Sequence, residues 1–283
     1  MPSITDVPRR LPIVPLIPLL LVLLAGSAAS QVPGELVRGP YLQMGGPDRV
    51  TIRWRTASPQ DSVVNLGPSA SSLPIVVSDP AMTTEHSVTV LGLSPETAYH
   101  YAIGSTGFGT LAGGDDAHRF VTAPPPGAER PLRIWAIGDS GTGNQYARLV
   151  RDAYYAFTGR THTDLWLMLG DNAYTSGTDA QYQTAVFQNM YEEMLTRSVL
   201  WPTLGNHDGI SADSATETGP YYDIFELPRM GEVGGLASGT EAYYSFDWGN
   251  VHFVCLDSHE TDRSPTGPMA TRLAADLAAN AST

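Results

Sequence analysis

The sequence predicts two folded parts in series, an all-β region followed by an α/β region. Residues 34–122 alternate short strand patterns with turn residues, which is typical of an antiparallel β-sandwich. From residue 132 onwards, apolar strand-like runs alternate with helical patterns, which is typical of a mixed sheet flanked by helices. Between the two, residues 123–131 are rich in proline and are expected to form a linker.

The first 30 residues have the pattern of a secretory signal peptide. Arg9 and Arg10 precede an apolar run at 11–25, and small residues follow at 26–30. The run is short for a membrane-spanning helix and contains three prolines, so we expect cleavage after Ser30 and no stable membrane anchor. The mature protein is therefore expected to be secreted or periplasmic.

The composition of the chain excludes several kinds of partner and site. The 29 acidic and 16 basic residues give a formal net charge of −13, and no basic cluster suits a nucleic-acid partner. An anionic substrate would be repelled by this field, so its site needs bound cations or oriented amides. Cys255 is the single cysteine, which excludes a disulfide framework and a multi-cysteine zinc site. We expect His86, His100 and His118 to be structural or solvated, because none has a second ligand at a recognisable spacing.

The all-β region contains one clear half-buried strand and one recognisable turn. Val50, Ile52 and Trp54 alternate with arginine and threonine, so one face of this strand is expected to be buried. Further on, a Leu-x-Pro-x-Thr-x-Tyr turn ends at Tyr99. This turn resembles the tyrosine corner of a fibronectin type III sandwich, and the resemblance implies a fibronectin type III-like fold for residues 34–122.

Three apolar runs of the α/β region each end in a glycine followed by a polar residue. Asp139, Asp171 and Asn206 are those polar residues. Because the carboxyl ends of neighbouring strands in an open α/β sheet converge on one crevice, we expect the three to meet in space. The glycine before each allows a sharp turn. Helical patterns are predicted at 144–157, 179–197 and 269–279.

The residues around these turns form the candidate site. The blocks are Gly138-Asp-Ser-Gly141, Gly170-Asp-Asn-Ala-Tyr174 and Gly205-Asn-His-Asp208. Their carboxylates, phenol and carboxamide are hard oxygen donors, which suit iron, manganese, magnesium or zinc. A carboxylate can bridge two cations about 3.5–4 Å apart, the separation that suits an in-line phosphoryl displacement. Asp171, in the middle block, is the natural bridge.

In this order, the three blocks resemble those of the purple acid phosphatases, a branch of the calcineurin-like metallophosphoesterases with a fibronectin-like domain ahead of the catalytic one. Related phosphoesterases have Asp-x-His in the first block, whereas here Gly141 replaces that histidine and Tyr174 appears in the second block. The resemblance implies a binuclear centre of Fe(III) and a divalent ion, which is iron, zinc or manganese. It makes Asp139 and Tyr174 ligands of Fe(III), Asp171 the bridge and Asn206 a ligand of the divalent ion.

The resemblance also implies the reaction. The protein is expected to be a secreted, metal-dependent acid phosphatase that hydrolyses small-molecule phosphate monoesters through a hydroxide held between the two ions. His207 would lie beside the scissile phosphate as a donor to the substrate or the leaving group, with Asp208 orienting it.

Two further histidine blocks of the family, Val-x-x-His and Gly-His-x-His, do not occur in this sequence. After His207 only His252 and His259 follow, and His252 matches a position that is not a ligand in the family. We therefore expect residues 132–283 to be the N-terminal part of a catalytic domain, and the 283-residue chain to be inactive by itself.

The same absence predicts an uncovered core. The strands around Trp135, Leu167 and Phe253 would lack the second sheet that covers them in the family. Exposed apolar patches promote association, and a site short of ligands loses metal-binding energy that supports folding. We therefore expect the chain to aggregate or to hold its second region loosely, while residues 34–122 fold around their own core.

Two alternative functions stay open. Gly138-Asp-Ser140 also matches the nucleophile block of a secreted Gly-Asp-Ser esterase, in which Ser140 would attack and Asn172 would help to form the oxyanion hole. That class needs a base near Ser140, and Asp257 and His259 do not have its Asp-x-x-His spacing. The non-enzymatic alternative is a secreted scaffold or adhesion protein without metals, which metal analysis would distinguish from a phosphatase.

Overall fold

The computed structural model describes residues 34–159, 161–188 and 190–280 of the chain. The expected signal peptide lies outside these described residues. Within them, every helix is too short or too polar to cross a lipid bilayer.

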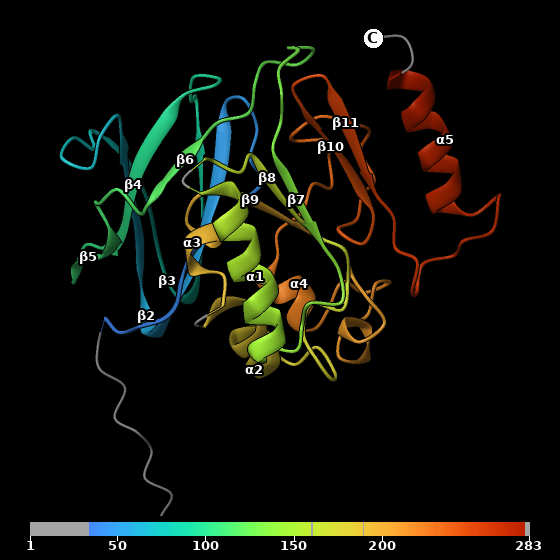
Figure 1. Cartoon of the computed structure of the whole chain (residues 1–283), viewed down its shortest axis with the longest axis horizontal. Coiled ribbons are helices and arrows are strands. Elements are labelled where there is room, and N and C mark those ends of the chain that lie inside the picture. The colour runs from blue at the N-terminus through green and yellow to red at the C-terminus, as the bar shows by residue number, and fades with distance from the viewer. Residues whose placement is uncertain (1–33, 160, 189, 281–283) are drawn as a thin grey trace, which may run out of the picture. The chain divides into compact units, whose positions relative to one another are not determined.

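The all-β region forms antiparallel strands, as predicted, and they are drawn in blue to green in Figure 1. The long central strand β2 pairs with β1, β3 and β4, and β4 pairs in turn with β5 and β6. The described strands of this region are β1 (Leu36–Gln43), β2 (Arg49–Gly67), β3 (Ile75–Leu91), β4 (Ala98–Ser105), β5 (Gly109–Gly113) and β6 (Arg119–Val121).

Strand β2 is covered on both faces, so the prediction of a half-buried strand is wrong for its outer side. The inner face is buried as expected, with Trp54 only 1% exposed. On the outer face Arg53 is 8% exposed, because it donates to the carbonyl oxygens of Asp223 and Ile224 at 2.7 and 2.6 Å. Those two carbonyl groups belong to the α/β region. The alternation of residues along β2 alone cannot predict that the α/β region packs on this face.

The α/β region has three parallel strands at its centre, β7 (Ile134–Ile137), β8 (Leu165–Met168) and β9 (Val199–Pro202). A separate antiparallel pair follows, β10 (Tyr244–Trp248) and β11 (Val251–Cys255). The helices predicted at 144–157 and 269–279 are confirmed within one residue as α1 (Gln145–Thr158) and α5 (Pro268–Asn280). A 3-10 turn (Asp208–Ile210) and α4 (Pro220–Ile224) lie between β9 and β10.

The single helix predicted at 179–197 is wrong, because the segment is divided into α2 (Asp179–Tyr182), a π-turn (Gln183–Phe187) and α3 (Glu192–Leu195). The π-turn is closed by a bond from the backbone N–H of Gln188 to the carbonyl oxygen of Gln183, at 2.7 Å. Tyr182 and Phe187 are both buried, and a five-residue turn brings both onto the same side where an α-helix would not. Phe187 packs there on Tyr41, with ring centroids 4.8 Å apart.

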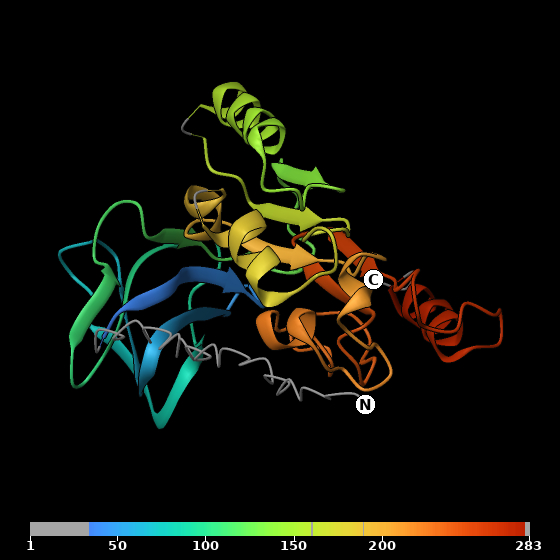
Figure 2. The same ribbon diagram turned by 90° about the horizontal axis from the view of Figure 1, so that it is seen from below.

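The two regions share one continuous sheet. Strand β1 pairs with β9 in parallel through Leu42 and Val199, and the resulting strand order is β5-β4-β2-β1-β9-β8-β7. Figure 2 shows α1 on one side of the β7–β9 strands. The division into domains at 34–122, 123–131 and 132–283 stays a prediction, since strand pairing runs across it.

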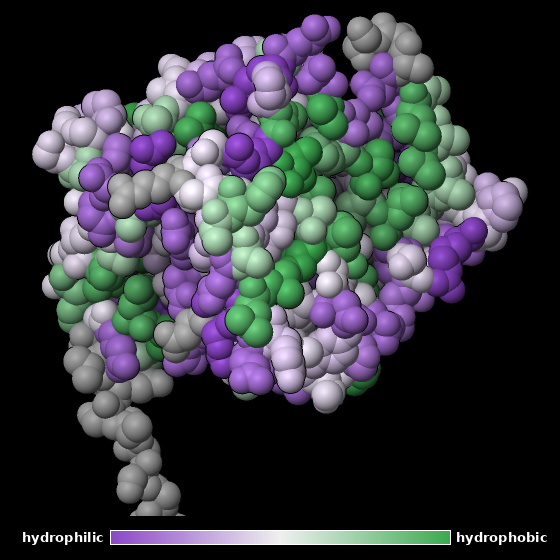
Figure 3. Space-filling model, viewed as in Figure 1, coloured by the Kyte–Doolittle hydropathy of each residue, from purple (hydrophilic) through white to green (hydrophobic). Residues whose placement is uncertain are grey.

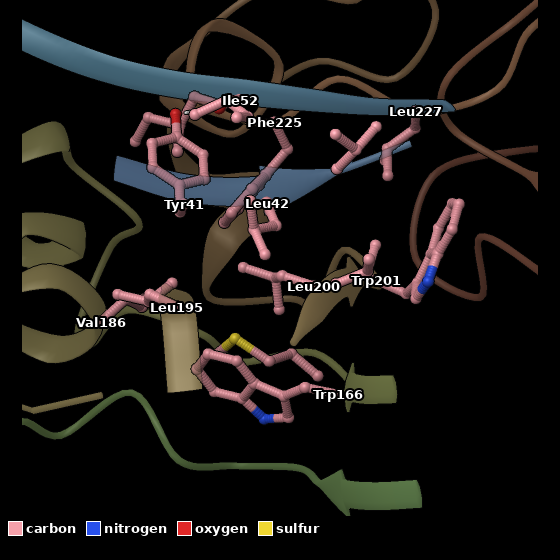
Figure 4. Packing of buried hydrophobic residues seen from close by; sticks show 14 of the residues in the cluster. Tyr41, Leu42, Ile52, Trp166, Val186, Leu195, Leu200, Trp201, Phe225 and Leu227 are labelled. Atoms are coloured by element: carbon pink, nitrogen blue, oxygen red, sulfur yellow. Dashed lines mark hydrogen bonds between the residues drawn. The ribbon is translucent and has the colours of Figure 1, made fainter. Parts of the chain in front are cut away.

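The hydrophobic core also extends across both regions. Figure 4 shows Tyr41 and Leu42 of β1 above Leu200 and Trp201 of β9, with Trp166 of β8 below them. Trp201 then stacks on Phe246 of β10 at a centroid separation of 3.8 Å. This stack attaches the β10–β11 pair to the main sheet.

Exposed apolar side chains are spread over several elements of the described chain, and one group of them lies on α1. The prediction placed the uncovered core around Trp135, Leu167 and Phe253, and next to those strands Leu169 is 57% and Leu256 36% exposed. Trp135 is 7% exposed because the ring of Tyr154, on α1, stacks over it at 4.3 Å. The outer side of α1 is exposed to solvent, where Leu149 is 61% and Phe157 is 87% exposed. Figure 3 shows apolar side chains along this helix.

Candidate metal centre

The three ligand turns meet at one edge of the sheet. Asp139, Asp171 and Asn206 follow the carboxyl ends of the parallel strands β7, β8 and β9. The backbone N–H of Asp139 donates to the carbonyl oxygen of Gly170 at 3.1 Å. A Cβ on Gly205 would lie 2.1 Å from the backbone nitrogen of Asp171, so the turn that carries Asn206 packs directly on the second turn.

Both aspartates have a strained backbone. Asp139 has φ of 56° and Asp171 has φ of 54°, in the left-handed region that non-glycine residues seldom adopt. Such a conformation costs on the order of 1 kcal/mol or more, and it persists only where the surrounding structure imposes it. The sharp turn is therefore made by the aspartates themselves as well as by Gly170, whose φ is 92°.

The hydroxyl group of Tyr174 connects the two carboxylates. It donates to Asp139 Oδ1 and lies 3.1 Å from Asp171 Oδ2. The other oxygen of Asp171, Oδ1, accepts the backbone N–H of His207 at 3.0 Å. Asp139 is exposed and Asp171 and Tyr174 are partly exposed, so this oxygen cluster is accessible from solvent.

His207 lies against this cluster. Its ring centroid is 4.4 Å from that of Tyr174, and its Nδ1 is 2.7 Å from the carbonyl oxygen of Thr175. Because a carbonyl oxygen only accepts, the proton of the ring must be on Nδ1, which leaves Nε2 for contacts with a substrate. The ring is thus oriented by Thr175 on one side and by Tyr174 on the other.

Asp208 does not orient His207, contrary to the sequence-based expectation. Its carboxylate is fully buried and accepts the backbone N–H groups of Asn172 and Gly205 and the hydroxyl of Tyr182. Burial raises the pKa of Asp208. Among the described residues, Asp208 makes no hydrogen bond with His207. Its hydrogen bonds instead connect the second turn to the third turn.

The sequence assigns Asn172 a role only in the esterase alternative, and it assigns Tyr182 none. Asn172 also donates from Nδ2 to the carbonyl oxygen of Thr203 at 2.9 Å, which ties the second turn to the end of β9. Its place within the Gly-Asp-Asn-Ala-Tyr block was the available signal. The sequence around Tyr182 contains no such signal, because the role of Tyr182 depends on its contact with Asp208, which lies on another turn.

Asn206 is exposed and its side chain makes no hydrogen bond to the described part of the chain. A group of three or more His, Cys, Asp or Glu side chains able to hold a metal ion does not occur among the described residues. The donors that do gather are carboxylate, phenol and amide oxygens. The site therefore consists of hard oxygen donors from three turns, without a histidine among them.

These oxygen donors fit a metal ion of the predicted kind. The carboxylates of Asp139 and Asp171 meet at the phenol oxygen of Tyr174, and carboxylate and phenol oxygens are donors that hard cations prefer. A cation bound by these three side chains would supply positive charge to the site. Asp171 and Asn206, on adjoining turns, would be the donors to a second ion.

The histidines outside the motifs have other surroundings. His86 is buried, lies between the hydroxyls of Thr56 and Ser62 at 2.8 Å each, and burial lowers its pKa to about 4. This structural role was predicted. His252 is bonded to two carboxylates of its own neighbourhood, whereas the ring of His259 packs directly on Gly209, just after the third turn.

The surroundings of Ser140 do not favour the esterase alternative. Ser140 is 6% exposed, and among the described residues its hydroxyl has no histidine partner that could act as a base. Its proposed helper Asn172 instead uses its side chain to brace Asp208 and Thr203.

Comparisons with known proteins agree with this fold. A family model described as calcineurin-like phosphoesterase matches residues 132–270. Purple acid phosphatase 23 of Arabidopsis thaliana is 28% identical over 221 residues, which cover 68% of this chain and 44% of that protein. "Probable inactive purple acid phosphatase 9" of the same plant is 26% identical over 215 residues, covering 63% of this chain and 31% of that protein.

The fold is also that of solved relatives. The purple acid phosphatase PPD1 from yellow lupin (Lupinus luteus) seeds superimposes with a TM-score of 0.60 at 17% identity, over 87% of this chain and 48% of that one. Residues 132–270 thus match the calcineurin-like phosphoesterase family, and the curated proteins to which the chain is similar are purple acid phosphatases. The chain spans less than half the length of the curated relatives that it matches.

Proposed function

We propose that the protein is a phosphoesterase that hydrolyses small-molecule phosphate monoesters with Fe(III) and a divalent ion. The observation that carries the proposal is the hydroxyl of Tyr174 bonded to both Asp139 and Asp171. A phenol between two carboxylates on strained turns has no evident structural purpose, whereas it is a suitable donor set for a hard cation.

The roles of the residues follow from their positions. Asp139 and Tyr174 would hold Fe(III), Asp171 would contact both ions, and Asn206 would hold the divalent ion. When bound, the ions would supply the positive charge that attracts a phosphate to a chain of net charge −13 and polarises its oxygens.

His207 would act on the leaving group. With its Nδ1 proton held by the carbonyl oxygen of Thr175, a protonated His207 presents its second proton on Nε2. That proton can pass to the leaving oxygen of the ester, a form of assistance worth about 10² to 10⁴ in rate. The ring of Tyr174 restricts the imidazole to this orientation.

The proposal is tested by the colour of the Fe(III)-loaded chain. A phenolate bound to Fe(III) absorbs visible light by charge transfer, so Fe(III) titration should produce a visible band. Tyr174→Phe should remove the band, while Tyr146→Phe, at an exposed tyrosine on α1, should keep it. A band that survives Tyr174→Phe excludes Tyr174 as a ligand.

Hydrolysis of p-nitrophenyl phosphate is the second measurement. Since the described donors include no histidine, we expect the 283-residue chain to turn over this ester slowly or not at all. Turnover that Asp171→Ala abolishes would mean that the oxygen donors suffice. Colour without turnover would support the metal site alone, and the absence of both would favour the scaffold alternative.

We further propose that the all-β region is fibronectin type III-like and that the protein is secreted or periplasmic. The hydroxyl of Tyr99 accepts the backbone N–H of Ser94 at 3.0 Å, which supports a tyrosine-corner turn at this point. N-terminal sequencing of protein exported from its host tests secretion, and a start at Gln31 is the expected result.

A further inference from the structure

Two arginines of the all-β region bind one carboxylate beside the candidate site. Arg55 of β2 reaches the two oxygens of Asp179 with Nη1 and Nη2, at 2.6 and 2.7 Å. Arg38 of β1 adds a third bond, from Nη2 to Asp179 Oδ1 at 3.0 Å, and its own side chain is fully buried. A planar fork on both carboxylate oxygens is the most directional ion pair available to a protein, so it fixes orientation as well as distance.

Asp179 is the first residue of α2, directly after the loop at 174–178. The side chain of Gln181 folds back from α2 and accepts the backbone N–H groups of Ser176 and Thr178, at 3.0 and 3.1 Å. The loop and the start of α2 therefore move as one unit. Any displacement of Asp179 therefore also displaces the loop through these two hydrogen bonds.

The same loop contacts the other two parts of the site. Its carbonyl at Thr175 holds Nδ1 of His207, and its carbonyl at Gly177 accepts the hydroxyl of Ser211 at 2.6 Å. A Cβ on Gly177 would lie 2.7 Å from Cα of Asp208, so the loop has no room to shift toward the third turn. The loop is held between the arginines on one side and the third turn on the other.

We propose that Arg55, assisted by Arg38, is a positioning residue that sets the place of Tyr174 and His207 through Asp179. The role in metal binding rests on the function proposed above, whereas the mechanical link does not. The all-β region then contributes residues that position the site, and it is more than a spacer.

The strand that carries Arg55 offers a matched control. Arg53, two residues earlier on the same face of β2, also crosses to the second region, but it binds the carbonyl oxygens of Asp223 and Ile224 at the end of α4. Removing Arg53 also costs two hydrogen bonds between the regions, here to neutral carbonyl oxygens, without touching the loop at 174–178. The two variants therefore separate a local effect on the loop from a general loosening.

The test combines hydrogen exchange and Fe(III) titration on the whole chain. Arg55→Ala should speed amide exchange at residues 176–178 by about tenfold and weaken Fe(III) binding, read from the visible band, by about tenfold, as losses behind a metal ligand do. Arg55→Lys, which keeps the charge but not the fork, should fall between Arg55→Ala and the wild type. Arg53→Ala should change neither readout, although it lowers the denaturation midpoint.

The outcomes that overturn the proposal are distinct from failure of the metal site. Unchanged exchange at 176–178 in Arg55→Ala, or equal acceleration in Arg53→Ala, refutes the positioning role. If Arg55→Ala does not fold, Asp179→Asn breaks the same pairs from the other side and should give the same local acceleration. If the wild type itself binds no Fe(III), the proposed function fails, and exchange alone then decides the mechanical link.

Discussion

Replacing Asp208 by alanine should destabilise the fold. The buried carboxylate of Asp208 is the acceptor for the backbone N–H groups of Asn172 and Gly205 and for the hydroxyl of Tyr182. Each of these three donors loses its acceptor in Asp208→Ala, in a place without solvent access. A buried donor without a partner costs about 1–3 kcal/mol, and local relaxation limits the total to about 3–5 kcal/mol.

Urea unfolding followed by tryptophan fluorescence measures this loss. Asp208→Asn, which keeps one acceptor oxygen and the shape of the side chain, should lose about 1–2 kcal/mol. Asp262→Ala is the control, because Asp262 makes similar bonds to Ser264 on the surface and its loss should leave the urea midpoint nearly unchanged.

A result below about 1 kcal/mol for Asp208→Ala would refute this reasoning. The competing view, in which Asp208 orients His207, predicts an unchanged urea midpoint and an effect on His207 alone. The two views therefore give opposite results in one experiment that needs neither metal nor substrate.

Three further predictions concern other parts of the chain. Burial lowers the pKa of His252, but its bonds to Asp247 and Asp276 outweigh burial and raise it overall, so its stabilisation is complete below about pH 6.5 and is lost as the pH rises through the raised value. The difference in unfolding free energy between the wild type and His252→Gln should therefore shrink as the pH rises above about 6.5, and a constant difference would contradict this account. Gly205→Ala should remove the Fe(III) band because its Cβ would overlap Asp171, whereas Gly107→Ala, in open space, should keep the band in the same titration. Phe157→Glu should reduce self-association in size-exclusion chromatography, because Phe157 is 87% exposed on α1. An unchanged elution profile would mean that the chain associates through another surface.

The sequence predicts best those features whose cause is local. Short apolar runs ending in glycine predict the strands before Asp139 and Asp171, because the pattern and the turn lie within one stretch of chain. Their convergence follows from the parallel order of the strands. The helices α1 and α5 are likewise predicted from their own periodicity.

The sequence does not predict features that depend on contacts between residues far apart in the chain. The π-turn after Tyr182 depends on Phe187 reaching Tyr41 of β1, and the burial of Arg53 depends on carbonyls of the second region. The true partners of Asp208 lie on other turns and helices, so its place beside His207 in the sequence suggests a relation that the fold does not use.

The pairing of β1 with β9 has a consequence for the biosynthesis of the protein. The paired residues Leu42 and Val199 are separated by 157 residues of chain, so at about 5–20 residues per second β1 leaves the ribosome roughly 8–31 s before its partner. During that interval the edge of β1 has unpaired backbone groups and can pair with another nascent chain. The yield of correctly folded protein should therefore depend on the rate of translation and on chaperones that shield β1 until β9 has been synthesised.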